Sequence, residues 1–377
     1  MNIRFVCVFA LALLARVSML ADFNDPNIEK VPLYRLIQNL EKQKDEDPTD
    51  PHAFYAIGRL YAMAFVKRTD SVDAIHRVGE EFYLPFYGYE KNLPHFFQIR
   101  TKADTSRKNF AKECLDRAIE NFKTAVKLDS TYIPSLLGLG WSYQHAGDSL
   151  QAERLYRTII RRAAKTEKDD YISIETAETA NYLLQLLDPR KDSLEIVSLS
   201  RKVKDFKPNY LISPLLIPLE ENLSLEQLVD TTASVAFDLD GSGGIGNWEW
   251  TSKKAGWLVY TPKGKEISDG MQLFGNRTFN VFWKNGFDAL AVLDDNGDGK
   301  INGEELLNLS VWTDQNKDGK SEPSELRSLG SLSIESFTYK YTTLSTRVLK
   351  AATGIQYKDG HTSALYDWYA RRKLSPL

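Results

Sequence analysis

The chain has 377 residues, of which 42% are hydrophobic, and carries 48 Lys and Arg against 51 Asp and Glu, a formal net charge of −3. This length allows two or three domains with a core each, and the composition is that of a globular protein. The charge balance argues against a nucleic-acid partner, which requires a clustered basic face.

Residues 1–21 have the pattern of a secretory signal peptide. Arg4 supplies a positive start, Phe5–Ala15 an apolar core, and Met19-Leu20-Ala21 a cleavage site. The apolar run is too short to span a bilayer, so we expect a secreted or periplasmic protein without a membrane span after processing. A buried N-terminal helix is the alternative. Removal of the signal leaves Cys114 as the single cysteine, which precludes an intramolecular disulfide.

Residues 22–206 carry helical signals with an internal repeat. Leu139, Gly140 and Tyr143 lie in the first helix of a 34-residue helix–turn–helix pattern. The positions that match between the two copies are Ile57, Gly58, Tyr61, Ala118, Phe122 and Ala125 in one, and Leu139, Gly140, Tyr143, Ala152, Tyr156 and Ile159 in the other. This pattern resembles the tetratricopeptide repeat, in which small residues allow paired helices to approach closely. An irregular helical bundle is the alternative.

An insertion at 67–107 interrupts the first repeat. Its segment 82–97 holds seven aromatic residues, which suit a lid or a stacking platform, or packing between helices. After the helices, residues 207–231 read as a proline-rich linker, because Pro208, Pro214 and Pro218 disfavour a helix and a central strand. Ser224 and Gln227 then form the capping box of a short helix.

Calcium loops are the strongest signal. The pattern D-x-N-x-D-G-x5-E occurs twice, in the Asp294 loop (294–305) and the Asp314 loop (314–325), and the Asp238 loop (238–249) is a third candidate with Ser242 at position 5. Positions 1, 3, 5 and 12 supply side-chain oxygens, position 7 a backbone carbonyl, and the glycine at position 6 permits the turn. The predicted Ca²⁺ ligands are Asp294, Asn296, Asp298, Lys300, Glu305, Asp314, Asn316, Asp318, Lys320, Glu325, Asp238, Asp240, Ser242 and Glu249.

Residues 232–341 resemble the EF-hand-like module of bacterial haemolysin-type exported proteins, through SVAFDLDGSG, AGWLVY, DGMQLFG, NGFDALAVLDDNGDG and LSVWTDQNKDGKSEPSELRSL. With the signal and the repeats, the chain is similar to planctomycete-type exported proteins of unassigned function. The eight residues between Glu305 and Asp314 cannot hold two helices, so we expect a short helix over 304–309 and a strand through Trp312. Tryptophans of the module suit a core or a sugar-stacking surface.

The predicted fold class is multidomain α+β. An N-terminal α-helical repeat domain (22–206) precedes the linker, a small α+β EF-hand-like calcium module (232–345) and a C-terminal hairpin or tail (346–377) that ends in a short helix near 366–372. Asp359-Gly360 marks a hairpin turn.

These features predict an exported, non-enzymatic calcium-binding protein. EF-hand-like loops would bind structural Ca²⁺, and the helices would bind a protein or peptide partner. The five histidines form no metal-binding motif and no nucleophile elbow occurs. A calcium-stabilised hydrolase or carbohydrate-binding protein is the alternative, and a calcium sensor is a third hypothesis.

Overall fold

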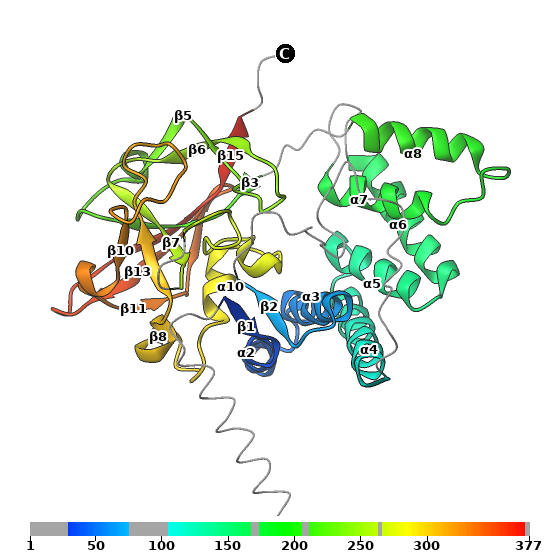
Figure 1. Cartoon of the computed structure of the whole chain (residues 1–377), viewed down its shortest axis with the longest axis horizontal. Helices are drawn as coiled ribbons and strands as arrows, with labels where there is room; N and C mark the ends of the chain where they lie inside the picture. Colours follow the sequence, from blue (N-terminus) through cyan, green and yellow to red (C-terminus); the bar gives the residue numbers. More distant parts are fainter. Residues whose placement is uncertain (1–28, 75–104, 167–172, 206–210, 263–265, 374–377) are drawn as a thin grey trace, which may run out of the picture.

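The structure is a computed structural model that describes residues 29–74, 105–166, 173–205, 211–262 and 266–373. The predicted signal peptide (1–21) and the aromatic segment 82–97 lie outside the described residues. Helical elements occupy one side of the molecule and a large curled sheet the other (Figure 1).

The helices of the N-terminal half pack in sequence order, each against the next, from α3 to α8. Their bounds are α2 (Leu33–Glu46), α3 (Pro51–Lys67), α4 (Thr105–Leu128), α5 (Ile133–His145), α6 (Ser149–Thr166), α7 (Ile174–Leu184) and α8 (Ser193–Asp205). Two short strands, β1 (Lys30–Pro32) and β2 (Ser71–Asp73), pair beside α2 and α3.

Glycines set the distance between paired helices. A Cβ atom at Gly58 of α3 would lie 2.9 Å from the Phe122 ring of α4, and one at Gly140 of α5 would lie 2.7 Å from the Tyr156 ring of α6. Both rings are fully buried. The expected close approach at these two equivalent positions is therefore confirmed, while membership of the tetratricopeptide family stays a prediction.

The C-terminal half contains one nine-stranded and one four-stranded antiparallel sheet. The first runs β10-β9-β7-β4-β14-β13-β11-β8 with β12 beside β13, and the second β3-β15-β6-β5. The strand bounds are β3 (Leu211–Ile212), β4 (Leu215–Pro218), β5 (Val229–Phe237), β6 (Gly246–Thr251), β7 (Ala255–Tyr260), β8 (Lys300–Asn302), β9 (Leu309–Trp312), β10 (Leu326–Ser328), β11 (Ile334–Thr338), β12 (Thr342–Ser345), β13 (Val348–Tyr357), β14 (Thr362–Trp368) and β15 (Ala370–Lys373). The C-terminal half also contains short helices, which are α9 (Leu225–Leu228), α10 (Gly286–Ala291) and the 3₁₀ turns η1 (Thr278–Asn280), η2 (Gly303–Leu306) and η3 (Gly330–Leu332).

The expectation of a small α+β EF-hand module is wrong. Residues 225–373 are dominated by the curled antiparallel sheet. The calcium-loop pattern is local and says nothing about flanking elements, and here the segments after the Asp294 and Asp314 loops lead into strands β9 and β10.

Two further predictions fail for a related reason. The proline-rich linker contains β4, which lies inside the large sheet between β14 and β7. Pro214 precedes this strand and Pro218 ends it, so the residues between them, Leu215, Leu216 and Ile217, can donate their N–H groups. In the expected C-terminal hairpin or tail (346–377), β13 and β14 form the hairpin, whereas the short helix expected near 366–372 is wrong, since these residues are the end of β14 and the start of β15.

Several local predictions are confirmed. The Ser224 N–H donates to Gln227 Oε1 over 2.9 Å at the start of α9. Gly360, with a φ of 88°, turns the chain between β13 and β14. The 3₁₀ turn η2 followed by β9 matches the short helix and strand expected between the two calcium loops.

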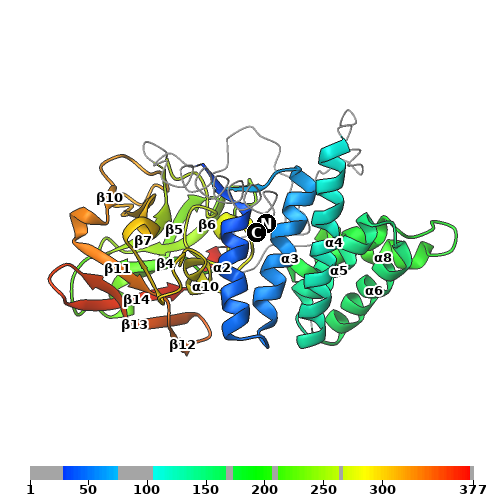
Figure 2. The ribbon, with the colours of Figure 1, turned by 90° about the horizontal axis from the view of Figure 1, so that it is seen from below.

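The core continues across the two halves. Apolar residues of α2 and α3 share one buried cluster with residues of the sheet and α10, and α2 lies between the sheet and α3 (Figure 2). Arg59 of α3 is fully buried and donates to the Asn280 carbonyl over 2.9 Å. The Phe282 ring contacts both Arg59 and Arg277, whose guanidinium carbons lie 4.2 and 3.9 Å from its centroid.

All seven tryptophans of the chain are buried. Trp248, Trp250, Trp257 and Trp312 have no exposed surface and lie in one cluster with the second sheet. The core interpretation of the tryptophans is therefore confirmed, since a buried ring cannot stack on a sugar.

Candidate metal centre

The Asp294 loop folds around its own carboxylates. Asp294 accepts the N–H groups of Asp298 (3.3 Å) and Gly299 (2.9 Å). Asn296 Oδ1 accepts the Asp298 N–H over 2.8 Å, and Asp298 Oδ1 accepts the Lys300 N–H over 2.8 Å. Positions 1, 3 and 5 are thus turned into the loop, and Gly299 has the positive φ, 82°, that position 6 demands.

Position 12 closes this loop. Glu305, on η2, accepts the N–H groups of Asp295 (2.8 Å), Asn296 (3.2 Å) and Asn302 (3.0 Å). Its side chain therefore faces the start of the loop. Burial raises the pKa of Glu305, and the nearby Asp294 carboxylate adds to that increase.

The Asp314 loop has the same internal hydrogen bonds. Asp314 accepts the N–H groups of Asp318 (3.3 Å) and Gly319 (3.0 Å). Asn316 accepts that of Asp318 (3.0 Å), and Asp318 accepts that of Lys320 (2.9 Å). Gly319 again has a positive φ, 72°. At positions 1, 3, 5 and 6 the two loops therefore present the same groups in the same order.

Glu325 occupies position 12 of the Asp314 loop. It accepts the Gln315 N–H over 2.7 Å through Oε1, while its Oε2 is buried without a hydrogen-bond donor. Burial raises the pKa of Asp314, and the charge of Glu325 contributes. Carboxylates at positions 1 and 12 therefore lie close enough to repel each other, which a cation between them would relieve.

Glu322 is a functional candidate that sequence reasoning missed. It stands at position 9 of the Asp314 loop, its Oε2 is buried without a donor, and the adjacent Glu325 carboxyl raises its pKa. Position 9 of such loops often contributes a ligand, frequently through water, so the spacing was the available signal. In the Asp294 loop this position is Asn302.

The Asp238 loop turns its first carboxylates inward but not its last. Asp238 accepts the N–H groups of Ser242 (2.9 Å) and Gly243 (2.8 Å), and Asp240 accepts that of Ser242 (3.1 Å). Glu249 at position 12 accepts hydrogen bonds from the Arg347 guanidinium and from the Arg371 N–H. It is therefore engaged by the C-terminal strands and not by the loop.

A second arginine also reaches the Asp238 loop. Arg372 donates to Asp240 Oδ2 over 3.1 Å. Asp269, which the sequence analysis did not single out, lies near Asp238 and is 3% exposed. Burial raises the pKa of Asp238 to about 8, and the carboxylates of Asp240 and Asp269 add to the shift. The sequence signal for Asp269 was the turn dipeptide Asp269-Gly270. In the structure this turn contacts the Asp238 loop, since the Gly270 N–H donates to the Asp238 carbonyl over 2.8 Å.

Within the part of the chain that the structure describes, no three His, Cys, Asp or Glu side chains gather closely enough to make a metal site. The carboxylates of the loops accept main-chain N–H groups instead. Lys300 and Lys320, whose carbonyls were predicted as ligands, donate their N–H groups to the carboxylates at position 5.

Comparison with protein-family models finds a similarity in this half of the chain. A family model described as an SPM domain matches residues 223–370, which include all three loops and most of both sheets. A segment of 98 residues is 43% identical to the iron-regulated protein FrpA of Neisseria meningitidis serogroup C. That match covers 24% of this chain and 9% of FrpA, so the chain spans only a small part of the relative's length.

Among the described residues, no helix combines the length and the apolar character needed to cross a membrane.

Proposed function

We propose that this chain is an exported protein whose Asp294 and Asp314 loops each bind a structural Ca²⁺ ion. The observation that supports it best is the shared hydrogen-bond pattern of the two loops. In both, the side chains of positions 1, 3 and 5 face inward, and a glutamate at position 12 accepts the N–H of position 2.

The donor set fits calcium. Each loop offers carboxylate, amide and main-chain oxygens, which are the ligands that this hard cation prefers. In the Asp314 loop, the Oε2 atoms of Glu322 and Glu325 are two further buried acceptors to which no group donates a hydrogen bond. Buried acceptors of this kind are costly unless a cation or a donor satisfies them.

A structural ion agrees better with the fold than a sensor does. Sensor EF-hands transmit binding by moving paired helices. Here η2 leads directly into β9, and β9 and β10 pair with each other on the large sheet. Extracellular calcium modules bind at ~10⁻⁴–10⁻³ M, a range that suits this role.

The helical half is proposed to bind a protein or peptide partner. The apolar faces of α2 and α3 are covered by the sheet, which leaves the later helices available. On α8, the terminal helix of the array, Leu194 is 87% and Val197 is 60% exposed. Export follows from the signal pattern at residues 1–21, and N-terminal sequencing of the secreted protein would locate the cleavage expected after Ala21.

Calcium titration of the chain by isothermal calorimetry tests the proposal. We expect two sites, of which Glu305→Gln and Glu325→Gln each remove one. Glu304→Gln is the matched control, because Glu304 is adjacent to Glu305 and exposed. Absence of calcium binding, or equal binding by the control and the position-12 variants, would refute the proposal.

A further inference from the structure

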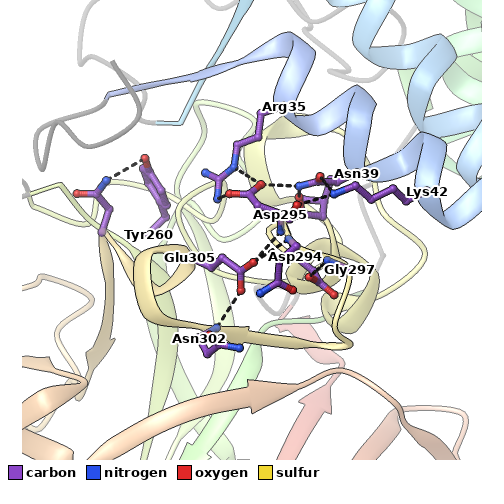
Figure 3. A network of polar contacts seen from close by, with 12 residues as sticks. Arg35, Asn39, Lys42, Tyr260, Asp294, Asp295, Gly297, Asn302 and Glu305 are labelled. Carbon is purple, nitrogen blue, oxygen red and sulfur yellow. Dashed lines mark hydrogen bonds and ion pairs between the residues drawn. The ribbon is translucent and has the colours of Figure 1, made fainter. Parts of the chain in front are cut away.

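The N-terminal helix α2 contacts the Asp294 loop through a polar network (Figure 3). Arg35 donates from Nε to Asp295 Oδ1 over 2.9 Å and places its second nitrogen 2.8 Å from Oδ2. Asn39 Nδ2 lies 2.7 Å from the same Oδ1, and Lys42 Nζ donates to the Asp295 carbonyl over 2.6 Å. Three side chains at helical spacing therefore hold one residue of the loop.

That residue stands beside two of the proposed ligands. Asp295 is position 2 of the loop, between Asp294 and Asn296, and its N–H donates to Glu305 Oε1 over 2.8 Å. The helix thus holds the main chain at the point where the two ends of the loop meet. Asn39 also donates to the Val292 carbonyl over 2.8 Å, which fixes the entry to the loop.

Apolar packing supports the same contact. Leu36 and Leu40 of α2 are at most 1% exposed and belong to one buried cluster with Leu293 and Ile301. Ile301 is position 8 of the loop and pairs with Phe337 on the sheet. The polar contact therefore borders this core: the side chains of Arg35 and Asp295 are 11% and 34% exposed.

The Asp314 loop provides an internal comparison. Its position 2 is Gln315, whose N–H also donates to the position-12 glutamate, over 2.7 Å. The Gln315 side chain reaches only the Lys253 carbonyl, at 3.5 Å. Lys317 of this loop donates to Asp230 Oδ2 over 2.5 Å, at the start of β5, so this polar partner lies in the sheet half and not on a helix of the N-terminal half.

We propose that Arg35, Asn39 and Lys42 are positioning residues of the Asp294 calcium site, so that calcium binding at this loop and docking of α2 strengthen each other. The inference rests on the proposed calcium function and adds a link between the two halves of the chain. Binding and docking are coupled reciprocally: a helix that holds the loop in its binding conformation raises its affinity, and an ion that orders the loop stabilises the docked helix.

Hydrogen exchange of α2 tests the coupling in the whole chain. We expect calcium to slow exchange of the α2 amides (33–46) by roughly five-fold or more, the lower end of typical coupling. Glu305→Gln should abolish this protection, whereas Glu325→Gln, which removes only the other ion, should retain it. Protection that is absent, or that both variants remove equally, overturns the coupling.

The effect of α2 docking on the loop is tested by measuring the calcium affinity of α2 variants. In the Glu325→Gln background only the Asp294 loop is left to bind. There, Asn39→Ala should weaken binding by roughly five-fold or more without changing the charge. Gln38→Ala is the matched control, because it removes an exposed amide from the neighbouring position of α2.

The two proposals fail separately. If the Glu325→Gln chain binds no calcium, the proposed site at the Asp294 loop is wrong and the coupling falls with it. If it binds calcium with equal affinity in the Asn39→Ala and Gln38→Ala forms, the calcium site stands and the positioning role of α2 is refuted.

Discussion

Arg347 forms an ion pair with Glu249, the residue that the calcium-loop pattern assigns to position 12 of the Asp238 loop. The carboxylate is 5% exposed, and the Arg371 N–H also donates to it, over 3.0 Å. With Arg372 on Asp240, two of the loop's three carboxylates are paired with arginines of the C-terminal segment. Glu249 and Asp240 therefore each have an arginine partner within the chain.

Loss of this ion pair should destabilise the protein whether or not calcium is present. Arg347→Ala leaves a buried carboxylate with one hydrogen bond, and we expect the free energy of unfolding to fall by about 3 kcal/mol, the lower end for breaking a buried pair. Urea denaturation in EDTA and in calcium measures it. Arg371→Ala is the control, because it removes the same charge from an exposed side chain. Equal effects of both variants would contradict the role given to Arg347.

Calcium should raise the thermal stability through the other two loops. At a tenfold excess over Kd, mass action predicts ~1.4 kcal/mol per site. We expect a higher melting midpoint in millimolar calcium than in EDTA for the native chain. The double variant Glu305→Gln with Glu325→Gln should melt at the same temperature in both buffers. Identical curves for the native chain would show that the loops bind no calcium under these conditions.

Helix packing in the N-terminal half should be sensitive to a single methyl group. Gly140→Ala places a Cβ atom 2.7 Å from the buried Tyr156 ring, and overpacking of this kind costs ~1–3 kcal/mol. Because alanine favours a helix by ~1 kcal/mol over glycine, a loss of stability reports the clash. Gly330→Ala has open space around it and serves as the control in the same denaturation experiment.

Asp367 should make stability fall as the pH rises. The side chain has no exposed surface, its Oδ2 accepts the Gly286 N–H over 2.7 Å, and burial raises its pKa to about 8. The unfolded carboxyl titrates near ~3.9, so the folded state holds the extra proton between these values. The contribution of Asp367 to the free energy of unfolding is fully present below the pKa of the carboxyl in the unfolded chain. It is lost as the pH rises through the pKa of the carboxyl in the folded protein.

Asp367→Asn tests this sign. An amide can accept the same N–H without carrying a charge, so the variant should gain stability relative to the native chain at pH 8 but not at pH 4. Urea denaturation in EDTA at both values separates this effect from calcium binding. A difference between the two proteins that is the same at both pH values would rule out titration of Asp367 as the cause.

Local sequence determines much of this protein. The glycine at position 6 and the Asp, Asn and Glu spacing form the Asp294 and Asp314 loops, since the hydrogen bonds inside each loop join residues at most ten positions apart. The same holds for the capping box of Ser224. The close approach of Gly58 and Phe122 joins two helices that are distant in the sequence, and it could be predicted because the two copies of the repeat match.

Tertiary structure alone decided the rest, because it depends on contacts between distant segments. β4 becomes an interior strand only when β7 and β14 lie on either side of it. Arg347 reaches Glu249 across nearly a hundred residues, and Arg35 reaches Asp295 across more than two hundred. The sequence pattern shows which carboxylates a loop contains. Whether an arginine pairs with them depends on the distant segments that pack against the loop in the folded protein.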